Sequence, residues 1–85
     1  SGKIIVVGKR AIAVFNVNGD FHVLSNTCAH RGGPLGAGKL RGIVVTCPWE
    51  GRQFEVTTGS GVSDTTLNVE PYLTKVENGQ LLVKL

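Results

Sequence analysis

Two short loops hold the residues whose types could do chemistry. The first loop carries Cys28 and His30, and the second carries Cys47 and Glu50. Both cysteines of the chain and one of its two histidines therefore fall in these loops. Thiolates and imidazoles are the side chains that hold iron–sulfur clusters, zinc or copper. Each loop also contains glycine and proline, which favour tight turns, so we expect the two loops to fold over one metal position.

The spacing of these residues leaves more than one interpretation open. Cys28-x-His30 is followed by residues 31–46 and then by Cys47-x-x-Glu50. Both cysteines could instead be buried thiols or form a disulfide, since a pair of cysteines serves either purpose. A tetrahedral zinc site from all four residues is chemically possible, although zinc sites usually use Cys-x-x-Cys pairs. The residues beside the cysteines must decide among these readings.

Length and charge limit the class of protein. Eighty-five residues make a single domain, 1–85, with room for one core. A net charge of +3 is too mild to indicate nucleic-acid binding. No apolar run is long enough to span a bilayer, and no signal-peptide pattern opens the chain. We therefore expect a cytoplasmic protein without a nucleic-acid or membrane partner. No Ser/His/Asp set, acid–base carboxylate pair or phosphate loop is present, so we expect no catalysis by the domain alone.

Short, β-branched segments separated by turns predict an all-β fold. Asn-Gly pairs at 18–19 and 78–79 favour type I′ hairpin turns, residues 57–66 look like an exposed loop, and no helical period lasts ten residues. The pattern predicts seven to nine strands in a small antiparallel sandwich or barrel. Residues from about 26 to 56 form an inserted part that carries the two loops. The predicted strands are Lys3–Val7, Ala11–Val17, Phe21–Leu24, Gly42–Thr46, Arg52–Val56, Tyr72–Val76 and Leu81–Leu85.

Nearly the whole chain resembles the Rieske-type [2Fe-2S] domains. Residues 28–35, Cys-Ala-His-Arg-Gly-Gly-Pro-Leu, resemble the first ligand loop of that family. Residues 47–54, Cys-Pro-Trp-Glu-Gly-Arg-Gln-Phe, resemble the second. Residues 13–21 are similar to the family's entry hairpin, and residues 72–85 are similar to its closing strands. The resemblance implies a Rieske-type barrel whose inserted loops hold a cluster.

By position, the resemblance also implies the ligands. Cys28 and Cys47 would hold the inner iron and His30 the outer iron, while Glu50 stands where a second histidine is expected. The implied function is an electron-transfer protein, a ferredoxin-like shuttle between a reductase and an oxygenase or another redox enzyme. The alternative is a cluster-free structural or regulatory subunit of an oxidoreductase, with Cys28 and Cys47 as thiols or a disulfide. In either case the two cysteines are expected close together.

Glu50 itself has three interpretations. Its carboxylate, a hard anionic donor suited to ferric iron, could ligate the outer iron and lower its potential. The domain could instead be a cluster-free relative that keeps the fold. In the third interpretation the glutamate was introduced and the natural protein has histidine there.

The remaining candidates surround this site. We expect His22 on a solvent-facing strand position. Trp49 is expected either as packing that shields the site or as a contact for a partner. Basic residues in or beside the loops are either ordinary solvated charge or a rim that docks an acidic redox partner. They are Arg31, Lys39, Arg41 and Arg52. Domains of the resembled family also have a strand before the segment at Lys3, so either a few native residues were trimmed here or the sheet has an open edge.

Overall fold

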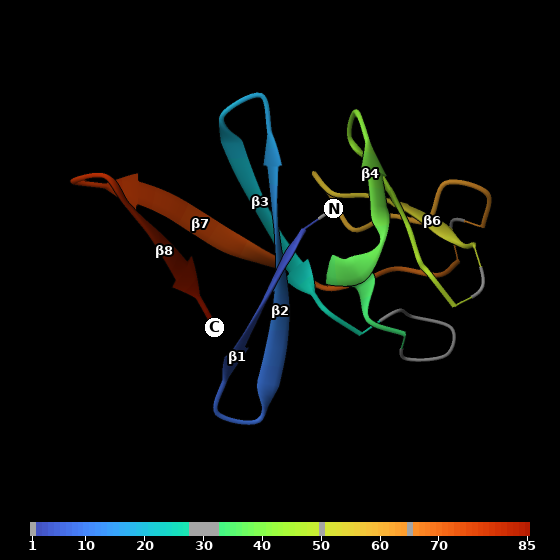
Figure 1. Cartoon of the computed structure of the whole chain (residues 1–85), viewed down its shortest axis with the longest axis horizontal. Coiled ribbons are helices and arrows are strands. Elements are labelled where there is room, and N and C mark those ends of the chain that lie inside the picture. The colour runs from blue at the N-terminus through green and yellow to red at the C-terminus, as the bar shows by residue number, and fades with distance from the viewer. Residues whose placement is uncertain (1, 28–32, 50, 65) are drawn as a thin grey trace.

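The computed structural model describes residues 2–27, 33–49, 51–64 and 66–85. These residues form eight strands and one 3₁₀ turn, which divide between a five-stranded and a three-stranded antiparallel sheet (Figure 1). The prediction of an all-β fold is confirmed. The elements are β1 (Lys3–Val7), β2 (Arg10–Val17), β3 (Asp20–Ser25), η1 (Leu35–Ala37), β4 (Lys39–Arg41), β5 (Val44–Thr46), β6 (Gln53–Glu55), β7 (Pro71–Glu77) and β8 (Gln80–Lys84).

The larger sheet has the strand order β1-β2-β3-β7-β8. Both predicted Asn-Gly hairpins are present: Asn18 and Asn78 adopt positive φ angles of 53° and 52°, as a type I′ turn requires. The glycines that follow them are also at positive φ. β3 pairs directly with β7, opposing Val23 to Tyr72. The segment between these strands, residues 26–70, therefore leaves the larger sheet and returns to it.

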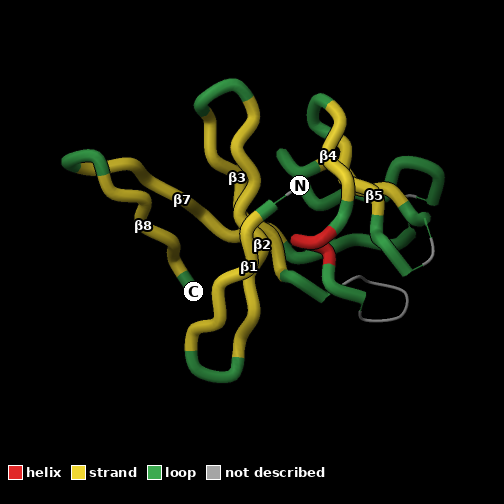
Figure 2. The backbone as a smooth tube through the Cα atoms, viewed as in Figure 1, coloured by secondary structure: helices red, strands yellow, loops and turns green. Residues whose placement is uncertain are grey.

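The smaller sheet lies within that inserted segment and has the order β4-β5-β6. The sequence pattern missed β4, because a three-residue Lys-Leu-Arg strand is too short to show alternation. The predicted strand start at Gly42 is wrong. Gly42 has a φ of 58° and forms the turn between β4 and β5. Figure 2 shows η1 between the two sheets, where it contacts β1 and β2.

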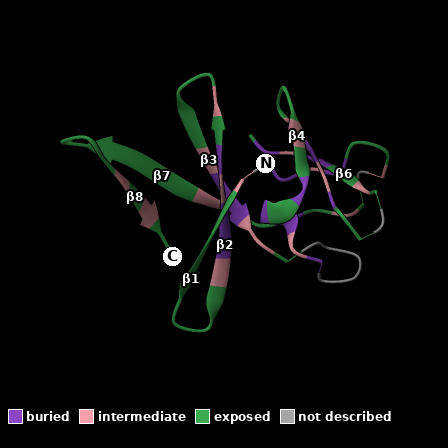
Figure 3. Cartoon of the chain, in the orientation of Figure 1, coloured by how far each residue is buried: buried purple, intermediate pink, exposed green. Residues whose placement is uncertain are grey.

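The core lies where the two sheets meet, as the purple segments of Figure 3 show. The larger sheet contributes side chains from the centre of β2 and β3, and the insertion contributes the rest. The core cluster consists of Ala13, Phe15, Leu24, Leu35, Val45, Cys47, Phe54, Val56 and Val69. No polar or charged side chain is buried among the described residues. This shared core holds the described part of the insertion against the larger sheet.

The outer strands of the larger sheet are exposed. Every residue of β1 is exposed although four of the five are apolar, and Leu73 on β7 is 73% exposed. In the described part of the chain β1 and β8 are the two edge strands of this sheet. Among the described residues, no helix is long and apolar enough to cross a membrane.

Candidate metal centre

The first loop is closed at its base by backbone pairing. Thr27 and Pro34 form an antiparallel bridge, and the Asn26 carbonyl accepts a 2.8 Å hydrogen bond from the Leu35 amide. The Asn26 side chain accepts a further bond, 2.7 Å long, from the Gly36 amide. These contacts bring the two ends of the loop together. The predicted ligands Cys28 and His30 lie between them and outside the described residues.

The second loop is closed in the same way. The Cys47 amide donates a 2.7 Å hydrogen bond to the Arg52 carbonyl, and the Gly51 amide donates a 3.0 Å bond to the Cys47 carbonyl. β5 and β6 continue this pairing, with Thr46 opposite Gln53. Cys47 is 1% exposed and belongs to the core. The fourth predicted ligand, Glu50, lies inside this closed loop and outside the described residues.

The two loops meet at Gly33. A Cβ atom on Gly33 would lie 3.0 Å from the Cys47 Sγ and 2.9 Å from the Trp49 Cγ. A Cβ at these distances would force the neighbouring side chains to shift, so glycine allows the backbone to approach them closely here. The backbone of the first loop therefore lies against the thiol of the second. Two thiolates and an imidazole on adjoining loops, as the sequence provides, are suitable donors for an iron–sulfur cluster.

The described residues contain one of the four predicted ligands. Within those ranges no three His, Cys, Asp or Glu side chains gather at one point. Because Cys28, His30 and Glu50 fall outside them, the ligand set stays a prediction. The same holds for the expected closeness of Cys28 and Cys47 and for their possible disulfide.

The structure corrects two of the secondary expectations. His22 is paired with the buried Phe15 in the β2–β3 register, so it lies on the core side of the sheet and is half-buried. The expected solvent-facing position is therefore met only in part, because both faces of β3 carry a buried residue next to it, Val23 on one and Leu24 on the other. Trp49 is 61% exposed, more than packing over the site implies, and the base of its ring lies beside Gly33.

Of the predicted basic rim, three residues are described. Lys39 and Arg41 are exposed on the outer face of β4. Together with Val44, Thr46, Gln53 and Val62 they line a groove of about 420 Å³. Arg52 points elsewhere: its guanidinium lies 3.8 Å from the Asp64 carboxylate. Arg31 lies outside the described residues.

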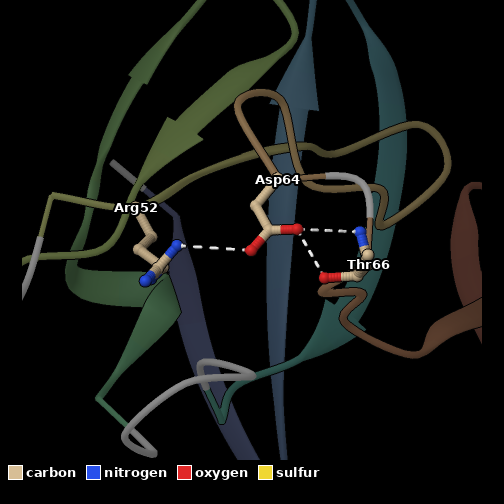
Figure 4. Close-up of polar contacts among 3 residues, drawn as sticks. All are labelled: Arg52, Asp64 and Thr66. Carbon is tan, nitrogen blue, oxygen red and sulfur yellow. Dashed lines mark hydrogen bonds and ion pairs between the residues drawn. The ribbon is translucent and has the colours of Figure 1, made fainter.

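The neighbour that sequence reasoning missed is the loop that contains Asp64. Residues 57–66 were predicted as an exposed loop, yet Gly59 and Gly61 are buried. Arg52 and Asp64 both line a cleft of about 310 Å³, to which this segment and the end of the second ligand loop contribute residues. Figure 4 shows Arg52 reaching Asp64, which in turn accepts hydrogen bonds from Thr66. An Asp-x-Thr pattern is the one local signal of such a turn.

Comparison with known proteins identifies the family. The model of the Rieske [2Fe-2S] domain matches residues 2–77. The chain belongs to the Rieske [2Fe-2S] domain family, and the resemblance found in the sequence is confirmed.

Individual relatives agree with this assignment. The ferredoxin component of a naphthalene 1,2-dioxygenase system from Pseudomonas putida is 28% identical over 95% of this chain and 79% of its own length. Ferredoxin CarAc from Metapseudomonas resinovorans is 33% identical over 91% of this chain and 73% of its own.

Solved structures show the same fold. In a complex of reduced oxygenase and oxidized ferredoxin of carbazole 1,9a-dioxygenase, one chain superposes with a TM-score of 0.90 at 30% identity. The match covers 99% of this chain and 88% of that one. A ferredoxin from Sphingomonas yanoikuyae B1 gives a TM-score of 0.89 at 27% identity, over 99% of this chain and 84% of that one.

Proposed function

We propose that this protein is a one-electron carrier of the Rieske ferredoxin type. In this proposal a [2Fe-2S] cluster is held by Cys28, His30, Cys47 and Glu50. The observation that supports it is the meeting of two closed loops at Gly33, with the Cys47 thiol on one side. The relatives named as ferredoxin components of dioxygenase systems support the electron-transfer role.

The cluster, when bound, supplies the redox chemistry by accepting and releasing one electron. The residues of this chain hold it and set its surroundings. Cys47 is fixed by its own amide and carbonyl bonds and is buried, so its thiolate is held in place and shielded from water. Hydrogen bonds and burial around the ligands tune the potential of such centres.

Glu50 is proposed as a ligand of the outer iron. A carboxylate brings a negative charge that a neutral histidine lacks. Since reduction adds an electron to the same iron, this charge opposes reduction and lowers the potential. Glu50→His is therefore expected to raise the potential, and Glu50→Ala to lose most of the cluster.

The proposed partners are a reductase and an oxygenase or similar redox enzyme. A relative seen in complex with an oxygenase supports this choice. The groove with Lys39 and Arg41 would favour an acidic surface on the partner, because complementary charge speeds encounter. Trp49, exposed beside Cys47, has the size and exposure of an interface anchor.

Iron and acid-labile sulfide, measured on the purified chain, test the proposal directly. The parent is expected to contain both and to show a redox transition. Cys47→Ser is expected to contain neither. Leu73→Ala, far out on an exposed strand, is the matched control and should match the parent.

The variants at position 50 separate the interpretations of Glu50. If Glu50→Ala retains as much iron and sulfide as the parent, Glu50 is not a ligand. If the parent binds no iron but Glu50→His does, the chain is cluster-free as it stands. If neither the parent nor Glu50→His binds iron, the alternative interpretation remains, a cluster-free subunit of an oxidoreductase.

A further inference from the structure

The second ligand loop has an attachment outside the loop itself. Its closing residue is Arg52, whose carbonyl accepts the Cys47 amide. The Arg52 side chain lies beside Asp64, with 3.8 Å between the guanidinium and carboxylate groups, and both residues line the cleft of about 310 Å³. The backbone of Arg52 therefore holds the ligand loop, while its side chain reaches a different segment.

That segment begins at Gly61 and ends at Leu67, and backbone hydrogen bonds close it into a turn. The Gly61 amide donates a 3.0 Å hydrogen bond to the Leu67 carbonyl, and the Leu67 amide donates a 3.2 Å bond to the Asp64 carbonyl. A Cβ on Gly61 would lie 2.2 Å from the Asp64 carbonyl oxygen, so this turn closes only around glycine. The turn is also tied to β6, because the Val62 amide donates a 2.9 Å bond to the Gln53 carbonyl.

Within this turn the Asp64 carboxylate is oriented by Thr66. Oδ1 accepts hydrogen bonds from the Thr66 amide, at 3.0 Å, and from the Thr66 hydroxyl. This arrangement turns Oδ2 toward Arg52, as Figure 4 shows. Contacts within its own loop therefore orient the Asp64 carboxylate toward the Arg52 guanidinium.

We propose that Asp64, aimed by Thr66, is a positioning residue for the second ligand loop and acts through Arg52. The pair is partly exposed, with side chains 36% and 43% accessible, so its contribution to global stability is small. Its effect is local: it restrains residue 52, which closes the loop that contains Cys47 and position 50. The inference rests on the proposed function only in taking that loop to supply cluster ligands.

Two readouts test this proposal, and one of them needs no cluster. The first is amide hydrogen exchange at Cys47 and Gly51, the two donors that close the loop. The second is the rate at which a chelator removes iron from the loaded protein. Asp64→Asn and Thr66→Val are expected to speed exchange at both amides. They are also expected to speed iron loss about tenfold. This is the lower end of the effect seen when residues that support metal ligands are replaced.

Conservative and remote variants provide the controls. Arg52→Gln removes the charge and should behave like Asp64→Asn, whereas Arg52→Lys can still pair with Asp64 and should recover most of the parent's behaviour. Glu77→Gln removes the Lys75–Glu77 ion pair, 2.9 Å long and distant in sequence, and should change neither readout.

The outcomes separate this proposal from the proposed function. Unchanged exchange at Cys47 and Gly51 in both Asp64→Asn and Thr66→Val overturns the positioning role, whether or not iron is bound. A response to Asp64→Asn alone also overturns it, because the loss of charge and not of orientation would then be responsible. Faster exchange in Asp64→Asn and Thr66→Val than in the parent, when the parent itself binds no iron, supports the positioning role and contradicts the proposed function.

Discussion

The two sheets of this protein differ in how they bury apolar surface. The larger sheet contributes three members of the core cluster, Ala13, Phe15 and Leu24, and leaves its outer strands exposed. The insertion has shorter strands but contributes the other six members. The insertion and the central strands of the larger sheet thus share the burial of apolar side chains, whereas the outer strands of that sheet are regular but exposed. The larger sheet is a platform, and the insertion that carries the ligands depends on packing and loop hydrogen bonds.

This difference predicts that truncating a large side chain destabilises the protein strongly in one region and very little in the other. Phe54→Ala in the insertion removes a ring that is 1% exposed and should cost about 3–5 kcal/mol of the unfolding free energy. Leu73→Ala on the larger sheet removes a side chain that is 73% exposed and should change it by less than about 0.5 kcal/mol. Denaturant unfolding of both variants measures the difference. Equal costs would contradict the division drawn here.

The glycines of the two turns around β5 and β6 offer a sharper comparison. Gly42 has positive φ and open space around it, so Gly42→Ala should cost only the roughly 1–2 kcal/mol of left-handed strain. Gly59 also has positive φ, but a Cβ there would lie 2.0 Å from the Val69 carbonyl oxygen. Gly59→Ala should therefore cost clearly more than Gly42→Ala in thermal or denaturant unfolding. A smaller cost for Gly59→Ala would show that the backbone at Val69 can shift away from residue 59 with little loss of stability.

Asn26 joins the larger sheet to the first ligand loop, so its removal tests the connection itself. Its amide donates to Ala11, its carbonyl accepts from Leu35, and its side chain accepts from Gly36. Asn26→Ala leaves the part-buried Gly36 amide unsatisfied and should cost about 1–3 kcal/mol. Ser25→Ala is the control, since the Ser25 hydroxyl accepts one 3.4 Å bond in an exposed position. If both variants unfold alike, the Asn26 side chain does not hold the loop.

The larger sheet was predictable from sequence because its signals are local. The Asn-Gly turns and the alternating residues of β2 fix the strands and the register of each hairpin. The pairing of β3 with β7 was not predictable in this way, because 45 residues (26–70) separate the two strands. Long-range pairing leaves no short-range pattern.

The insertion was harder to predict for the same reason. β4 is too short for alternation, and the segment after β6 has a loop composition although Val69 is in the core. The candidate ligands were identified from residue types and spacing, which are local. The Arg52–Asp64 contact was missed, because two charges twelve positions apart carry no signal until the loop between them is folded.

The smallest expected effect on stability concerns the exposed edge of the platform. β1 presents apolar residues to solvent, and Val6 is 68% exposed. In the described chain β1 also has a strand partner on one side only, and unpaired backbone groups at such an edge favour association with another chain. Val6→Lys should therefore reduce concentration-dependent association in sedimentation velocity, while changing the unfolding free energy by less than about 0.5 kcal/mol. Val62→Lys places the same charge at an exposed position of the insertion and should leave association unchanged. If Val62→Lys reduces association and Val6→Lys does not, the surface through which chains associate lies on the insertion. The insertion, and not the larger sheet, would then be the region with the associating surface.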